Sequence, residues 1–400
     1  MKVWIKLLVG TGLGIAVAVF VPGDLAGVFG WLQGFVLQIG RYALVPLMFF
    51  SLTIGIHQLR KEGQFWGLFL RNLALMFAVS VVVILVGLVT ALAFLRLRIP
   101  IRPEEEAGIA GLDIPGGILE VFPSNMFAAL SGDGSFLLPI YVFAFFLGMA
   151  LAYDNAHGRP IAALVDSLSR VFFRVASFFI DISGLCLIAL SAYWMIRFRS
   201  ALQLGFFTSL MAILVLLTLI LAFVVAPLCL YLIRPKTKPW KALYGSLGPA
   251  IASFFSGDMN FSLLILVGHS KEMGIRRRAS ALTLAMFSTF CRAGSAMVAA
   301  VAFIVVFNSY SFINITFAEI VSVGLASLGI SFLLARHSGD GAYVALAVLC
   351  LGFGRFQEGY LLLRPVAFFL VGVGTLLDLM IASFANYAMA RIGGLENGPS

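Results

Sequence analysis

The chain has 400 residues, 61% of them hydrophobic and 11% charged, and its mean hydropathy is +1.05. Soluble domains average about 45–50% apolar and about 25% charged residues, so the composition argues against a soluble protein and indicates a polytopic membrane protein. The net charge of +9 does not predict nucleic-acid binding, because the basic residues cluster in short loops, as is typical of the cytoplasmic side of a membrane.

The sequence carries no signature of catalysis or of a cofactor. It contains neither HExxH nor GxSxG, and its four histidines and four cysteines show no metal-ligand spacing. All four cysteines lie in apolar segments, where small buried side chains are the simplest interpretation, and only Cys291 is placed to line a site. We therefore expect neither an enzyme nor a metal or cofactor protein.

Six apolar segments follow one another in the first half of the chain. The first has a signal-like layout, but no small-residue cleavage site stands out near Pro22, so we expect a retained helix. The fourth is interrupted at Pro123-Ser124-Asn125, at Ser131-Gly132-Asp133-Gly134-Ser135 and at Pro139, which predicts a helix broken into pieces. The expected segments span residues 3–21, 26–59, 65–97, 118–153, 161–196 and 202–232.

The second half of the chain differs, because its apolar runs are broken in the middle. Residues 242–268 are split at Ser256-Gly257-Asp258, and each half has about 10 residues, too few to cross a bilayer. Residues 315–351 are split at Arg336-His337-Ser338-Gly339-Asp340-Gly341. We predict a re-entrant helical hairpin for each run, followed by crossing helices at 279–307 and 361–391.

The loops predict an orientation and an internal symmetry. The basic clusters, among them residues 60–61, 234–241 and 271–278, fall on one side only if both split runs return to their own side. This predicts an all-α cell-membrane protein with eight transmembrane helices, two re-entrant hairpins and cytoplasmic N- and C-termini. Hairpin plus crossing helix then occurs twice in opposite sense, an inverted repeat that is typical of transporters.

Charged residues stand within three of these breaks. Arg292 lies in Cys291-Arg292-Ala293-Gly294-Ser295, in the middle of a crossing run, and Asp258 and Asp340 lie at the two hairpin tips. A charge inside a membrane is costly and normally faces a protein interior or a water-filled path, so it indicates a functional site. We expect the three breaks to meet and form a substrate site.

Three stretches carry a resemblance to a known family. They are Arg41-Tyr-Ala-Leu-Val-Pro46-Leu-Met-Phe-Phe-Ser51, Phe122–Leu130 followed by Val142–Leu151, and Lys271-Glu-Met-Gly-Ile275. They resemble the dicarboxylate/amino acid:cation symporters, the glutamate transporter family, and the resemblance covers nearly the whole chain. It implies a homotrimer that works by an elevator movement. It also implies a scaffold domain, residues 1–64 (helices 1–2) and 101–200 (helices 4–5), and a transport domain, residues 65–100 (helix 3) and 201–400 (helix 6, both hairpins, helices 7 and 8).

The sequence departs from this family at its functional motifs. The family's serine-rich first tip aligns with Ser256–Asn260, and its Val-Pro-Gly-Ala-Gly second tip aligns with His337–Gly341. Its Asn-Met-Asp-Gly-Thr break, which supplies sodium ligands, aligns with Cys291–Ser295, where the aspartate and asparagine are missing and an arginine is present.

The last helix keeps one functional charge of the family and lacks others. Asp378 matches the aspartate that holds a substrate amino group. Ile381, Ala382 and Met389 stand where the family has an arginine, a threonine and a sodium-binding aspartate, and Asn386 lies one position from a family asparagine.

Arg292 carries the main hypothesis on coupling. Sodium prefers hard oxygen ligands, and a fixed guanidinium at the aligned position would repel it. One interpretation is that Arg292 replaces a coupling cation, so that transport is sodium-independent and either proton-linked or exchange. The other is that Arg292 pairs with Asp258 or Asp340 and only fixes the break.

The intramembrane aspartates also have two interpretations each. Asp258 and Asp340 are candidate proton carriers; alternatively each forms a hairpin-tip cap or an ion pair with Arg292 or Arg336. Asp378 either faces the substrate or forms a structural pair with Arg364 or Arg292.

The sequence thus predicts a secondary active transporter of a small organic solute, an amino acid or a carboxylate, with altered or absent sodium coupling. Arg292 or Arg336 would bind one carboxylate. The alternative is a non-transporting binding or sensing relative, or an anion-conducting pore, on the same fold, and concentrative uptake separates the two. The expected substrate-binding residues are Asp378, Arg292, Ser256, Asp258, Ser338, Gly339, Asp340, Ser295 and Asn386, and the residues expected to couple cations or protons are Arg292, Asp258 and Asp340.

Overall fold

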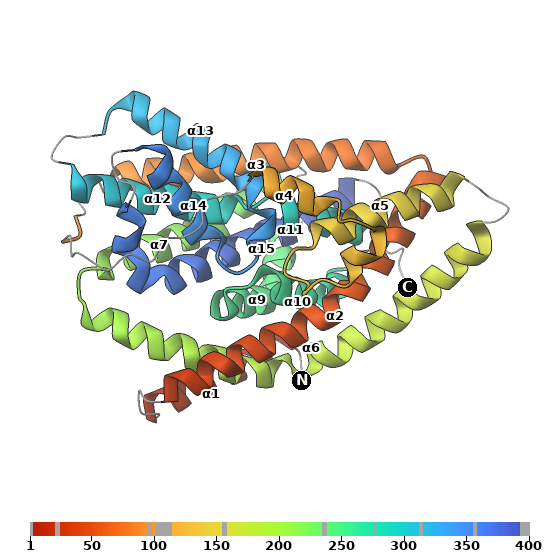
Figure 1. Ribbon diagram of the computed structural model, residues 1–400, viewed down its shortest axis with the longest axis horizontal. Coiled ribbons are helices and arrows are strands. Elements are labelled where there is room, and N and C mark those ends of the chain that lie inside the picture. The colour runs from red at the N-terminus through yellow and green to blue at the C-terminus, as the bar shows by residue number, and fades with distance from the viewer. Residues whose placement is uncertain are drawn as a thin grey trace.

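The computed structural model of the chain is all-helical in the part that it describes (Figure 1). The described residues are 3–20, 25–93, 98–100, 114–153, 158–233, 238–275, 277–311, 315–354 and 358–392. The basic residues Lys2, Arg96, Arg102, Arg234, Lys236, Arg276 and Arg355, which include part of the evidence for orientation, lie outside these ranges.

The first half contains four long helices and one broken segment. The long helices are α1 (Val3–Phe20), α2 (Ala26–Lys61), α3 (Phe65–Ala93) and α6 (Gly158–Gln203). The broken segment comprises α4 (Ile114–Val121), the short η2 (Met126–Leu130) and α5 (Leu138–Tyr153). Two of its three expected interruptions separate these pieces. Pro139 instead lies in the first turn of α5, where a missing N–H costs no hydrogen bond.

The sixth segment was predicted as one uniform helix, but it changes its winding midway. α7 (Thr208–Ile220) passes through a π-helical stretch, η3 (Leu221–Val225), into α8 (Ala226–Ile233). Pro227 explains the change, because it has no N–H to donate to the preceding turn. The N–H of Ala226 instead reaches the Leu221 carbonyl, five residues back.

The second half is split where the sequence predicted. α9 (Pro239–Ser256) and α10 (Met259–Glu272) meet at Gly257 and Asp258, and α11 (Arg277–Phe290) and α12 (Ala293–Tyr310) flank Cys291 and Arg292. α13 (Phe317–Leu333) with η4 (Leu334–Arg336) is followed by α14 (Gly341–Gly352), and the chain ends in η5 (Gly359–Val366) and α15 (Ala367–Ile392).

Eight helical segments of the described chain are long and apolar enough to cross a membrane. The number equals the predicted one, but the set differs. The segment 317–336, the first arm of the second split run, has 20 residues and is one of the eight. The broken fourth segment is not among them, because its longest helix, α5, has only 16 residues. The eight are 3–20, 26–61, 65–93, 158–203, 208–233, 280–310, 317–336 and 359–392.

α1 and α6 lie on one side of the molecule and α3 on the other, and most of the broken segments lie between them (Figure 1). α1 packs on α6, and α2 packs on α6 and α5, whereas α12 packs on α15, α3 and α14. Figure 1 shows α1 and α6 along one side, α3 and α13 along the other, and α9, α10, α12 and α15 between them. Residues 293–308 of α12 are all buried. The break that precedes α12 therefore lies in the protein interior.

Glycines allow α1 and α6 to approach closely. A Cβ at Gly10 would lie 2.0 Å from the carbonyl oxygen of Gly184, and a Cβ at Gly14 would lie 2.0 Å from Ser191 Oγ. Small residues at such crossings are a main source of helix association in lipid, where no hydrophobic driving force holds helices together.

This crossing gives a prediction with a control on the same helix. Gly10→Val should lower the melting temperature of the purified protein, because the clash costs about 1–3 kcal/mol. Gly12→Val should leave the melting temperature nearly unchanged, since no atom lies within 4 Å of a Cβ at Gly12. Equal melting temperatures for the two variants would contradict the observed α1–α6 contact.

Candidate functional site

Three breaks and one helix converge in the interior. The α9–α10 tip contacts the second tip directly, because the N–H of Met259 donates to the Ser338 carbonyl at 2.9 Å. The N–H of Arg292 donates to the Ser331 carbonyl of α13 at 3.1 Å. The predicted meeting of the three breaks is therefore present in the structure, and α15 completes it by supplying Asp378.

Arg292 and Asp378 form an ion pair at the centre of this convergence. Arg292 Nε lies 3.0 Å from Asp378 Oδ2, and the two side chains are 2% and 0% exposed. The Nε–H does not point along this line, so the contact is ionic without a well-aligned hydrogen bond. Arg292 Nη2 donates to the His337 carbonyl at 3.2 Å, which connects the guanidinium to the second tip.

The start of α12 supplies the other partners of Asp378. Oδ1 accepts the N–H groups of Gly294 (2.7 Å) and Ser295 (3.1 Å), and Oδ2 accepts Ser295 Oγ–H (2.6 Å). These N–H groups have no partner within α12, because they belong to its first turn, and the positive end of the helix favours a carboxylate. Gly294 permits the contact, since a Cβ there would lie 2.5 Å from Leu377 Cβ.

Asp258 is the second buried carboxylate and links three elements. Its Oδ1 accepts the N–H of Phe261 at 2.9 Å, which caps the start of α10. Its Oδ2 accepts Arg41 Nη2–H of α2 at 2.7 Å and Ser338 Oγ–H of the second tip at 3.2 Å. Asp258 thus caps a tip, as one interpretation expected, but its cationic partner is Arg41, not Arg292 or Arg336.

Glycines at the tips make this close packing possible. Gly257 has a φ of +65° and ends α9 with its N–H donating to the Ser253 carbonyl. A Cβ at Gly339 would lie 3.3 Å from Asp258 Oδ2, and a Cβ at Gly341 would lie 3.0 Å from Arg292 Nη2. The second tip therefore covers both a carboxylate and a guanidinium with bare backbone.

The structure separates the predicted site residues into a buried cluster, the exposed Asp340 and the distant Asn386. Arg292, Asp378, Ser295, Asp258, Ser338 and Gly339 belong to the two ion-pair networks described above, and buried Ser256 accepts the N–H of Asp258 at 3.2 Å. Asp340 lies at the start of α14 with a 56% exposed side chain, 3.0 Å from His337 Nδ1. Arg292 thus pairs with neither Asp258 nor Asp340, because it forms its ion pair with Asp378.

Asn386 lies away from this cluster. It is two turns beyond Asp378 on α15, and its Nδ2 donates to Ser270 Oγ of α10 and Ser280 Oγ of α11. The side chain joins the base of the first hairpin to α15, so the structure does not bring Asn386 to the Arg292–Asp378 cluster, and its role in a substrate site stays a prediction.

Sequence reasoning missed Arg41 as a site residue. It lies in the middle of α2, within a stretch used only for the family resemblance, and its side chain is 23% exposed. A charge in an otherwise apolar helix was the available signal. Gln33, two turns earlier on α2, adds a second contact to the first tip by donating to the Ser256 carbonyl at 3.4 Å.

The Arg292–Asp378 pair gives a double-variant prediction. Arg292→Met alone should cost about 3–5 kcal/mol of stability, because it leaves a buried carboxylate unpaired. Asp378→Asn alone should also destabilise, whereas combining the two should cost clearly less than their sum. The measurement is the melting temperature of the purified variants. Additive losses would show that the pair is not coupled.

An exposed pair provides the matched control. Arg170→Met removes the partner of Asp166 on α6, where the arginine side chain is 70% exposed. We expect a smaller loss of stability than for Arg292→Met, because the Asp166 carboxylate that loses its partner is 23% exposed, whereas Asp378 is fully buried.

Comparison with known proteins identifies the family. The model of the sodium:dicarboxylate symporter family matches residues 3–392. The C4-dicarboxylate transport protein of Dechloromonas aromatica (strain RCB) is 21% identical over 206 residues, which are 48% of this chain and 44% of that relative. The match therefore spans less than half the length of the relative. The family consists of membrane transporters of small organic solutes and not of enzymes, as the sequence predicted. The chain belongs to the sodium:dicarboxylate symporter family.

Proposed function

We propose that the protein is a secondary active transporter of a small amino acid or carboxylate, and that it works without a coupling sodium ion. The observation that carries the proposal is the buried Arg292–Asp378 pair at the meeting point of both hairpin tips. In this proposal each tip is the turn of a re-entrant hairpin, and the two hairpins belong to an inverted repeat. The protein lies in the cell membrane with both termini in the cytoplasm. The proposed assembly is a homotrimer.

Two features of the break between α11 and α12 support sodium independence: the positive charge of Arg292 and the lack of free oxygen ligands on Asp378. Asp378 already accepts three hydrogen bonds and contacts a guanidinium, so its oxygens are not free to coordinate a metal ion. A sodium ion in the same low-dielectric space would be repelled by the fixed charge of Arg292. In this proposal Arg292 takes the place of the coupling cation, and the remaining drive comes from a proton or from exchange.

The second tip indicates how a substrate would bind. In the structure the second tip bonds to both charged residues: Arg292 donates to the His337 carbonyl, and the Ser338 hydroxyl donates to Asp258. Withdrawal of the second tip would free a cationic donor and an anionic acceptor together. Gly339 and Gly341, which cover these two groups, are two residues apart and thus within about 7 Å of each other. A zwitterionic amino acid complements these two charges, with its carboxylate on Arg292 and its ammonium on Asp258.

Arg41 offers a further donor to a carboxylate. Its Nε is buried and has no hydrogen-bond partner in the described part of the chain, although Nη2 holds Asp258. A buried unpaired donor is costly, and a ligand oxygen would satisfy it. Binding of a plain carboxylate is therefore the second substrate class to test.

Packing supports an elevator movement between two bodies. α1, α2 and α5 pack on α6, while α9, α12 and α14 pack on α15. Between these two groups, α2 packs on α10 and α11, and α1 and α6 pack on α9. We propose that the first group is the scaffold and the second, with α3, is the transport domain. The Arg41–Asp258 pair and the Gln33–Ser256 contact then cross the sliding interface and must break in each cycle.

The function is tested by uptake into proteoliposomes. We expect concentrative uptake of a neutral amino acid or a carboxylate that is unchanged when choline replaces sodium. Uptake that rises steeply with sodium would overturn the proposal of a built-in cation. Ligand-induced thermal stabilisation without concentrative uptake would instead favour a binding or sensing role.

The elevator proposal is tested at the proposed interface. In Gln33→Cys/Ser256→Cys, we expect a bifunctional thiol-reactive reagent to form an intrachain cross-link, because the Gln33 side chain reaches the Ser256 backbone in the wild-type arrangement. Adding Arg41→Gln should lower its yield, because losing a charged hydrogen bond of about 1.5–3 kcal/mol destabilises this arrangement. Arg60→Gln, an exposed change on the same helix, should not. A yield insensitive to Arg41→Gln would argue against a movable contact.

A further inference from the structure

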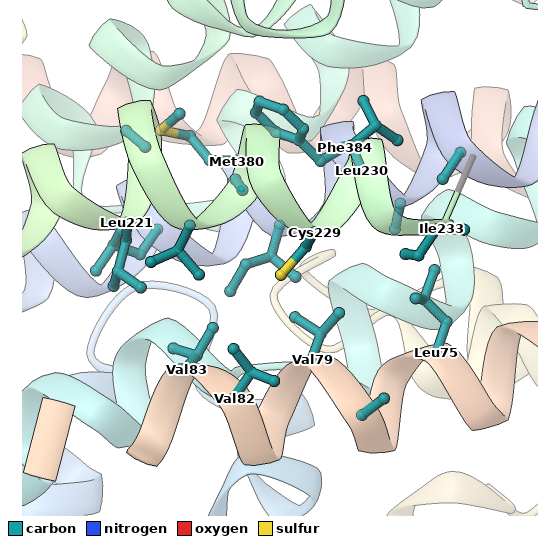
Figure 2. A pocket seen from close by; sticks show the side chains of 18 of the residues that line it. Leu75, Val79, Val82, Val83, Leu221, Cys229, Leu230, Ile233, Met380 and Phe384 are labelled. Atoms are coloured by element: carbon teal, nitrogen blue, oxygen red, sulfur yellow. The ribbon is translucent and has the colours of Figure 1, made fainter. Parts of the chain in front are cut away.

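An apolar groove opens between α3, the α7–η3–α8 segment and α15 (Figure 2). Its cavity volume is about 260 Å³. In Figure 2, Val79, Val82 and Val83 of α3 face Leu221 and Cys229 across the groove, with Met380 and Phe384 behind them. Among the described residues no charged side chain lines the groove, and the lining gives a water-soluble solute no charged partner.

The groove depends on the π-helical stretch and on small side chains. Ala222 and Ala226 lie within and directly after η3 and both line the groove, as does Ala78 on the opposite wall. Alanines on both walls leave depth between the helices. π-helical stretches are frequent at functional positions in helices, and they place side chains off the regular α-helical register.

The surroundings of the groove indicate lipid. The outer faces of both walls expose large apolar side chains, including Phe77 and Leu85 on α3 and Val224 and Leu228 on the other wall. In a membrane these faces contact acyl chains. The groove follows α3 from Leu75 to Val83, a length of about 12 Å at about 1.5 Å per residue.

One end of the groove carries positive charge. Arg71 is exposed one turn before Leu75 on the same face of α3. Lys238 and Lys241, both exposed, follow the end of α8 just beyond Ile233, which lines the same end. Basic side chains at the end of an intramembrane groove match an anionic lipid headgroup.

We propose that this groove is a binding site for an anionic phospholipid, with one acyl chain between α3, α8 and α15 and the phosphate beside Arg71. The bound chain contacts Leu377, which precedes Asp378 on α15. The site lies outside the two ion-pair networks and does not depend on which solute is transported.

The test is native mass spectrometry of the detergent-purified protein with added phosphatidylglycerol or phosphatidylcholine. Ala78→Phe fills the groove and should reduce retained phosphatidylglycerol about tenfold, because several methylene groups lose apolar contact. Ala74→Phe is the matched control, one turn away, exposed and outside the lining. Equal lipid retention by the two variants would overturn the site.

The headgroup is tested separately. Arg71→Gln should weaken phosphatidylglycerol binding about fivefold and leave phosphatidylcholine binding unchanged. Arg60→Gln is the control for removal of an exposed positive charge. Equal loss of both lipids, or equal effects of the two variants, would overturn the assignment of the phosphate to Arg71.

A third measurement does not depend on the variants folding. A phospholipid with a photoreactive group in its acyl chain should label peptides containing residues 75–83 and 221–233 of the unmodified protein. Labelling elsewhere only would overturn the proposal. So would an oligomer that dissociates on Ala78→Phe but not on Ala74→Phe, because the groove would then be an interface with a second copy of the chain.

Discussion

The arrangement of the interior depends on a buried positive charge that cannot be lost. A guanidinium stays protonated under all ordinary conditions, so Arg292 needs a permanent partner when its side chain is only 2% exposed. Asp378 is that partner, and the free N–H groups at the start of α12 hold the carboxylate in place. The break before α12, the close approach of α12 to α15 and the second tip all contribute contacts to this ion pair.

A second ion pair repeats this logic with a different consequence. Asp258 joins α2 to both hairpin tips through Arg41 and Ser338, whereas the Arg292–Asp378 pair lies between elements of one packed group. The Arg41–Asp258 pair thus joins the two packed groups, whereas the Arg292–Asp378 pair lies within one of them. A protein that moves one group against the other would preserve the Arg292–Asp378 pair and exchange the partners of Asp258, which fits the different exposure of the two arginines, 23% for Arg41 and 2% for Arg292.

Local sequence was sufficient for much of the fold and part of the site. Apolar runs of membrane-spanning length, and glycine, serine and charged residues within them, act on the backbone nearby, so the positions of the breaks at Gly257, Arg292 and Ser338 were predictable. The π-helical stretch was not, because Pro227 is compatible with either a kink or a change of winding. The span count agreed in number but not in membership: α13 with η4, expected as a hairpin arm, has 20 residues, whereas α5 of the broken fourth segment has only 16.

The sequence by itself determined that the chain is a helical membrane protein of the symporter family with charges at three breaks in its apolar runs, because hydrophobicity, breaks and motifs are local properties. Only the tertiary structure decided which charges meet. Arg41 and Asp258 are 217 positions apart, and Asn386 lies on the same helix as Asp378 but reaches the other end of the first hairpin. Partner choice depends on helix rotation, on the depth of each tip and on glycines that allow backbone contact, and these are set by packing across the whole molecule.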